Sequence, residues 1–197
     1  MRLMSIWGWL LIGAASWALA IVLKIVADFL VQRSTNIALQ DWAAAGLSGI
    51  WSSICEMGLC ALAFWFWGAV FADALVTALG AALAELIVLL PATLSAHFAV
   101  AQSKAKDRAN WSAFFIERSL VLANHLASRG LLWLGIAGPA GLPAVASAFG
   151  LFAASEGVQA YGQARDWDWL NKRTQWLFFA FLFAIICTEI ALLIVWR

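Results

Sequence analysis

The sequence predicts an all-α polytopic membrane protein with about six transmembrane helices in a single transmembrane domain. Of its 197 residues, 64% are hydrophobic and 12% are charged, whereas soluble domains are about 45–50% apolar and about 25% charged. Its apolar segments reach the ~20 residues that a helix needs to cross a bilayer. The predicted helices cover residues 5–30, 43–70, 74–100, 111–137, 142–162 and 175–196.

The first segment, residues 5–30, is too long for a typical cleavable signal peptide, and few basic residues precede it. The connections are short, so consecutive helices are expected to be antiparallel neighbours. Several of the thirteen tryptophans lie near segment ends, as in interfacial belts. The three cysteines lie within apolar segments and are interpreted as small buried hydrophobic side chains.

Basic residues in the connections predict the orientation. The first, third and fifth connections are basic, whereas the opposite side offers only Arg2 and Arg197. The positive-inside rule therefore places both termini on the non-cytoplasmic side, with a bacterial inner membrane as the expected location. Lys24, near the cytoplasmic end of the first segment, is expected to snorkel. The basic residues on the predicted cytoplasmic side are Arg33, Lys104, Lys106, Arg108, Arg165, Lys172 and Arg173.

The fourth segment is unusual because one stripe of it is polar. At ~100° per residue, its six polar residues fall within an arc of roughly 140°, and the opposite arc is apolar. Such a stripe within a membrane must face other helices or water. The six residues are Glu117, Arg118, Asn124, His125, Ser128 and Arg129.

The second, third, fifth and sixth segments each carry one glutamate near mid-depth. At ~1.5 Å per residue, Glu56 lies ~20 Å along its helix, Glu85 ~16 Å, and His125, Glu156 and Glu189 ~21 Å. These groups are expensive at the bilayer centre. One interpretation is that they join helices by hydrogen bonds; the other is a polar chamber for a metal, a proton or a substrate. The residues alone leave both open.

Two chemistries fit this set. His125 and Glu85 are candidate ligands for zinc, which lowers the pKa of a bound water, although one histidine with glutamates also suits manganese or iron. No HExxH or CxxC spacing occurs. Without a metal, Glu56 and Glu85 form a candidate pair in which one carboxyl is protonated and the other acts as a base.

Several other polar side chains have simpler interpretations. Ser128 lacks a third orienting group and is a poor candidate nucleophile. Ser52 and Ser53 are expected to bond to carbonyls of their own helix. Glu117 and Arg118 are sequence neighbours that do not face one another on a helix, so each is expected to have a partner elsewhere.

The segment from Glu117-Arg118 through His125 to Ser128 resembles the ER-x6-H-x2-S motif of the YhfC-type intramembrane protease family. That family belongs to the superfamily of CAAX-processing and bacteriocin-related membrane proteases, to which the scaffold subunit of gamma-secretase is also similar. The resemblance runs from about Trp9 to Glu156 and implies a CAAX-protease-like helix bundle that cleaves peptide bonds within the membrane.

Three further motifs of the family are eroded in this chain. A helix with a paired-Glu, Gly, Arg motif is matched only in part, a GHGGxE motif lacks its histidine, and a His-x3-Asp pair keeps only the acid. In the first motif Glu56 and Gly58 match, and Cys55 and Leu59 replace the other Glu and the Arg. In the second motif Gly80 and Glu85 match, and Ala81 replaces the His. In the third motif Glu156 matches the acid, and Phe152 replaces the His.

The resemblance implies a non-catalytic or catalytically impaired member, a pseudoenzyme acting as a scaffold or accessory subunit that binds other membrane helices through its Glu56, Glu85 and His125 face. The alternative is an active metallo- or glutamate-type intramembrane peptidase, with those three residues catalytic and zinc as a possible cofactor. A proton-coupled carrier would predict an internal repeat, and none is evident. No basic run suggests nucleic acid. Residues expected to support the site or bind a partner are Glu117, Arg118, Asn124 and Glu156.

Overall fold

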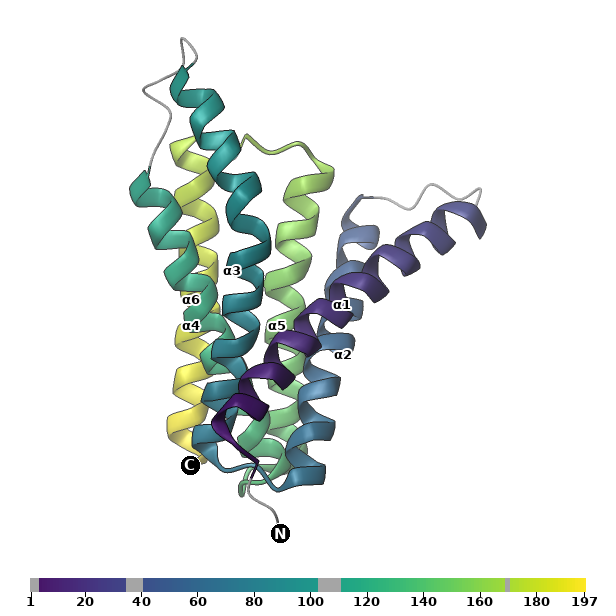
Figure 1. Cartoon of the computed structure of the whole chain (residues 1–197), viewed down its shortest axis with the longest axis vertical. Helices are drawn as coiled ribbons and strands as arrows, with labels where there is room; N and C mark the ends of the chain where they lie inside the picture. Colours follow the sequence, from purple (N-terminus) through teal and green to yellow (C-terminus); the bar gives the residue numbers. More distant parts are fainter. Residues whose placement is uncertain (1–3, 35–40, 103–110, 169–170) are drawn as a thin grey trace.

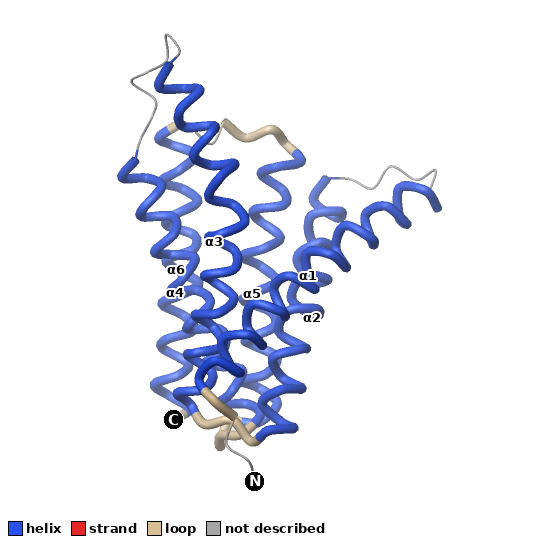
Figure 2. The backbone as a smooth tube through the Cα atoms, in the orientation of Figure 1, coloured by secondary structure: helices blue, strands red, loops and turns tan. Residues whose placement is uncertain are grey.

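The computed structural model describes the backbone of residues 4–34, 41–102, 111–168 and 171–197, and the side chains of 4–26, 42–91, 112–168 and 171–197. In these ranges the chain forms six α-helices and no strand (Figure 1, Figure 2), which confirms the all-α prediction. The helices are α1 (Ile6–Ser34), α2 (Asp41–Trp67), α3 (Phe71–Gln102), α4 (Trp111–Ile136), α5 (Gly141–Ala164) and α6 (Lys172–Trp196).

Five of these helices, α1, α2, α3, α5 and α6, are long and apolar enough to cross a membrane. The predicted fourth span, which corresponds to α4, is not among them because its polar residues make it the least hydrophobic helix of the six. The outer surface is apolar, with Trp7, Leu142 and Ile194 each more than 70% exposed. Lipid is the environment that accommodates such a surface, so the chain is an integral membrane protein.

The helices run alternately up and down, and both termini lie at the same end of the bundle (Figure 1). Helix α4 packs against α2, α3, α5 and α6, so its polar stripe is covered by protein on several sides. Helix α1 runs obliquely across the bundle and packs on α3 and α2. The side chains of the basic residues Arg33, Lys104, Lys106 and Arg108, used to predict orientation, lie outside the described residues.

Glycines allow two helix pairs to approach closely. A Cβ atom on Gly13 of α1 would lie 1.9 Å from the carbonyl oxygen of Thr77 on α3, and one on Gly80 of α3 would lie 2.1 Å from that of Leu10. A Cβ on Gly49 of α2 would lie 2.3 Å from a carbonyl oxygen of α5. Small residues at such crossings are the usual basis of helix packing in membranes, and they fix α1 on α3 and α2 on α5.

An apolar core occupies the end of the bundle near the termini. It contains Trp9, Phe64 and Phe152, together with aliphatic residues of α4. The indole nitrogen of Trp133 donates to the carbonyl oxygen of Ala69 at 2.7 Å and closes the α2–α3 connection over this core. Phe152 is 1% exposed and also contacts the polar cluster described next, so the core forms the floor of that cluster.

Candidate functional site

A chain of buried charged side chains joins α2, α4 and α3. Arg129 of α4 donates through Nη2 to Oε1 of Glu56 on α2, and its Nη1 lies 2.7 Å from Nδ1 of His125 one turn earlier. The other ring nitrogen, Nε2, lies 3.1 Å from Oε2 of Glu85 on α3. Arg129 is 0% exposed and Glu56 and His125 are each 3% exposed, so these bonds form away from solvent.

The partners of His125 define its tautomer. A guanidinium has donors only, so Nδ1 of His125 must accept the bond from Arg129, and the ring proton must lie on Nε2. From there it is donated to Glu85. Both nitrogens of the His125 ring are therefore occupied. The ring is also held by Phe152, whose centroid lies 5.9 Å away.

Arg118 extends the chain toward the N-terminal end of α4. Its Nη1 donates to Oε1 of Glu85 at 3.1 Å, and its Nη2 donates to Oε1 of Glu117 at 2.5 Å. The prediction that Glu117 and Arg118 do not face one another is wrong, because the long arginine side chain spans the ~100° between neighbouring positions. Glu85 therefore accepts from two residues, His125 and Arg118.

A second polar group joins α1, α2 and α5. The Nζ atom of Lys24 lies 3.5 Å from Oε2 of Glu156, and Ser52 donates to the same oxygen at 3.0 Å. Lys24 thus has a carboxylate partner on α5. Ser53 donates to the carbonyl oxygen of Phe149 at 2.9 Å. Both serines bond to α5, so the prediction that they bond to their own helix is wrong.

Asn124 joins α4 to α5. Its Nδ2 donates to Oγ of Ser155 at 3.3 Å, and Ser155 donates its own proton to the carbonyl oxygen of Phe152 at 2.8 Å. In this arrangement Oδ1 of Asn124 is buried without a hydrogen-bond partner among the described residues. Ser128 donates to the carbonyl oxygens of Asn124 and His125, an arrangement that does not prepare a nucleophile.

A small cavity lies between these groups, enclosed by α3, α4, α5 and α6. Its volume is about 20 Å³, which is room for about one water molecule. The Phe178 and Leu182 side chains of α6 form an apolar wall. The polar side chains that line it are Glu85, Glu117, Asn124, His125, Ser155, Glu156 and Gln159.

Glu189 of α6 does not line this cavity. It is 0% exposed, and neither carboxylate oxygen has a hydrogen-bond partner among the described residues. An ionised carboxylate in that state is prohibitively costly, so Glu189 is present as the neutral acid.

The three cysteines differ in burial. Cys55 and Cys60 are buried as expected, whereas Cys187 of α6 is exposed on an apolar helix, where it can contact lipid.

The described residues do not fit a zinc site. Among them, no group of three or more His, Cys, Asp and Glu side chains is arranged to hold a metal ion. His125 and Glu85 bond to each other, and the Arg129 guanidinium occupies the remaining nitrogen of the ring. A divalent metal at this point would have two protein ligands and a cation beside it, which is too few ligands for zinc.

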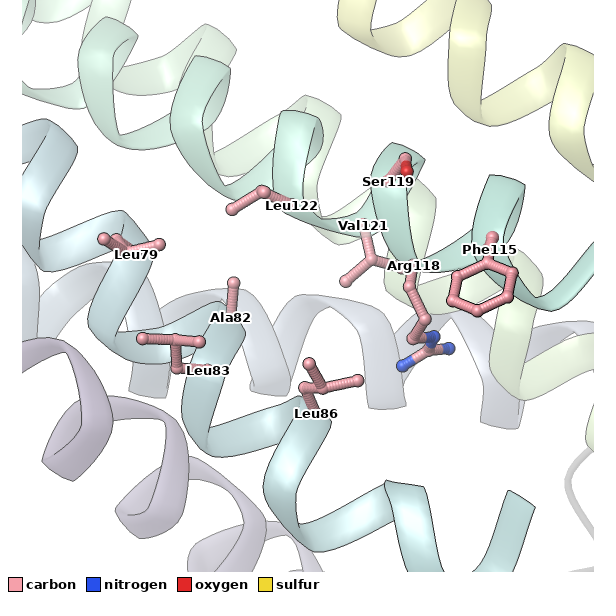
Figure 3. Close-up of a pocket in the computed structure, with 9 residues that line it drawn as sticks. All are labelled: Leu79, Ala82, Leu83, Leu86, Phe115, Arg118, Ser119, Val121 and Leu122. Atoms are coloured by element: carbon pink, nitrogen blue, oxygen red, sulfur yellow. The ribbon is translucent and has the colours of Figure 1, made fainter. Parts of the chain in front are cut away.

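A separate apolar groove of about 200 Å³ lies between α3 and α4. Figure 3 shows its α3 side, which includes Leu79, Leu83 and Leu86, facing the α4 side, which includes Leu122. The side chain of Arg118 reaches from α4 toward α3 at one end of the groove. Its Nε atom is buried without a hydrogen-bond partner among the described residues.

The structure brings together the three residues predicted to be central, Glu56, Glu85 and His125. The His125 ring lies close to both glutamates. Their burial makes the predicted partner-binding face wrong, because side chains only 3% exposed, as for Glu56 and His125, cannot contact another protein. Arg129, which is the centre of the cluster, was predicted only as one of the six residues of the polar stripe. The available signal was its position one turn from His125 on the polar stripe.

Comparison with known proteins gives no match: no family model fits the sequence, and no curated protein or solved structure is significantly similar to it. The fold and composition therefore define only the class of the protein, which is an all-α integral membrane protein with five candidate spans among the described residues.

Proposed function

We propose that this chain is a non-catalytic, intramembrane-protease-like helix bundle that acts as a scaffold or accessory subunit of a membrane complex. One observation carries the proposal: the side chains best suited to catalysis bond to one another. Arg129 takes an oxygen of Glu56 and a nitrogen of His125, and Glu85 binds His125 and Arg118.

These contacts oppose catalysis for a geometric reason. A general base or nucleophile activator must have a free lone pair within reach of the reacting atom. The imidazole of His125 has none, since one nitrogen accepts from Arg129 and the other carries a proton held by Glu85. What the cluster does support is rigidity, because its bonds tie α2, α3 and α4 at mid-bundle.

The apolar groove between α3 and α4 is a surface suited to a partner (Figure 3). Its wall is aliphatic, including Leu79, Leu83 and Leu86, and its volume is about 200 Å³, enough for an aliphatic side chain of a neighbouring transmembrane helix. Helices associate in lipid by such close packing.

The test is gentle extraction of the tagged protein from its own membrane and an inventory of companion chains. We expect constant stoichiometric partners with the native sequence, and their loss in Leu83→Trp, which fills the groove. Ile194→Trp, on the exposed face of α6, is the matched control and should keep them. Recovery of a monodisperse protein without companions would contradict the scaffold proposal.

The second candidate is an active glutamate-type intramembrane peptidase. One observation favours it: Glu85, His125 and Glu156 border a cavity that has room for about one water molecule. In this case Glu56→Gln should abolish processing of a membrane substrate while the protein stays folded and inserted. Unchanged processing in both Glu56→Gln and Glu85→Gln would eliminate this candidate.

A further inference from the structure

The charged side chains inside the bundle differ in how far they are exposed. Those at the centre of the cluster, Arg129, Glu56 and His125, have side chains that are at most 4% exposed. The side chains of Lys24 and Glu156 are 29% and 27% exposed, although they form an ion pair between α1 and α5. The protein therefore covers the centre of the cluster but leaves its α1–α5 side partly open.

The arrangement of the helices accounts for this exposure. Among the described residues, α5 packs mainly on α2, α4 and α6, and α1 packs mainly on α3 and α2. The close crossing of α1 with α3, at Gly13 and Gly80, lies in the half of the bundle near the termini. Toward the opposite end α1 diverges from α3 and α5 (Figure 1). The long side chain of Lys24 crosses this divergence to reach Glu156.

Two further polar side chains at this end of the bundle are only partly buried. The side chain of Glu117 on α4 is 33% exposed, and Gln159 of α5, about one turn beyond Glu156, is half-buried. Both of them border the one-water cavity, as Glu156 does. Because the same side chains are exposed and line the cavity, the cavity is the inner end of a crevice that reaches the surface.

Lipid does not solvate such a surface. Ionisable side chains within membrane spans face the bundle interior or a water-filled cavity, and the neutral forms of an amine or a carboxyl also need hydrogen-bond partners. Glu156 lies eight residues before Ala164, the last residue of α5, which is ~12 Å from that end of the helix. Its exposed surface therefore faces water well inside the bundle.

We propose that a water-filled crevice between α1, α3 and α5 opens at the end of the bundle opposite the termini and extends to Glu156. It admits water and small hydrophilic solutes, and it ends at the buried cluster around Arg129. The Lys24–Glu156 pair lies inside it. The crevice does not depend on whether the protein is a scaffold or a peptidase.

The experiment measures the labelling of single cysteines by a charged, membrane-impermeant methanethiosulfonate, with the full chain in its own membrane. The parent chain carries Cys187→Ala, which removes the exposed cysteine, and its buried Cys55 and Cys60 give the background. Glu156→Cys should be labelled, and so should Gln159→Cys, which keeps the α1–α5 ion pair. Labelling should occur from the membrane face opposite the termini, which is identified by protease removal of a C-terminal tag.

Ala154→Cys is the matched control. Ala154 lies two residues from Glu156 on α5, within ~3 Å of its depth, but on the exposed outer face of the helix. Ala154→Cys should stay unlabelled in the membrane and become labelled only after denaturation in dodecyl sulfate. Equal labelling of Ala154→Cys and Glu156→Cys in the membrane would overturn the proposal. Absence of labelling in Glu156→Cys and Gln159→Cys proteins that keep the Tm of the parent chain would overturn it too.

Discussion

Replacing Arg129 with methionine tests the central ion cluster directly. Arg129 is 0% exposed, and its loss leaves the carboxylate of Glu56, which is 3% exposed, without its cationic partner. Removing one member of a buried ion pair costs about 3–5 kcal/mol, whereas replacing both members with apolar side chains is often neutral. Nδ1 of His125 also loses its donor, for roughly 1–3 kcal/mol. We therefore expect the Glu56→Met/Arg129→Met double variant to be less destabilised than either single variant.

The free energy of unfolding can be followed by tryptophan fluorescence during titration from mild detergent into dodecyl sulfate, since the chain has thirteen tryptophans. Arg173→Met, an exposed arginine at the start of α6, is the control and should change stability by no more than about 0.5 kcal/mol. A double variant whose loss equals the sum of the two single losses would show that Glu56 and Arg129 are not energetically coupled, and the reasoning would fail.

Two further perturbations test the packing. Gly13→Ala places a Cβ 1.9 Å from a carbonyl oxygen of α3 and should lower the free energy of unfolding by about 1–3 kcal/mol through overpacking, as measured in the same titration. The control is Gly150→Ala, whose Cβ meets nothing within 4 Å, so this variant should be neutral or stabilising. Equal effects of the two variants would refute the close crossing of α1 and α3. Trp133→Phe removes the bond to Ala69 and should lower stability by about 0.5–1.5 kcal/mol. An unchanged unfolding midpoint for Trp133→Phe would show that this bond contributes nothing.

Helix number and approximate depth could be predicted from the sequence, whereas partners could not. Hydrophobic length determines where a span begins and ends, and the 3.6-residue period identified the polar stripe that carries His125. Depth alone grouped Glu189 with Glu56 and Glu156, yet the structure leaves Glu189 apart from both. Contact depends on how each helix is rotated, which is decided by close crossings such as that at Gly13, and single-helix patterns do not contain that information.

The rotation of α2 and α3 also turns two faces of these helices toward different neighbours. Cys55 and Leu59 line an apolar groove between α2 and α1, and Ala81 is 0% exposed at the crossing of α3 with α1, with its backbone nitrogen 3.0 Å from a Cβ built on Gly13.

Cys55, Leu59 and Ala81 therefore lie toward α1, as Gly58 and Gly80 also do, while Glu56 and Glu85 face α4. The guanidinium that Glu56 binds comes from Arg129. The face against α1 is thus committed to apolar packing and the face against α4 to ion pairing, so the charged cluster joins α2, α3 and α4 and leaves the contact with α1 to small and apolar side chains.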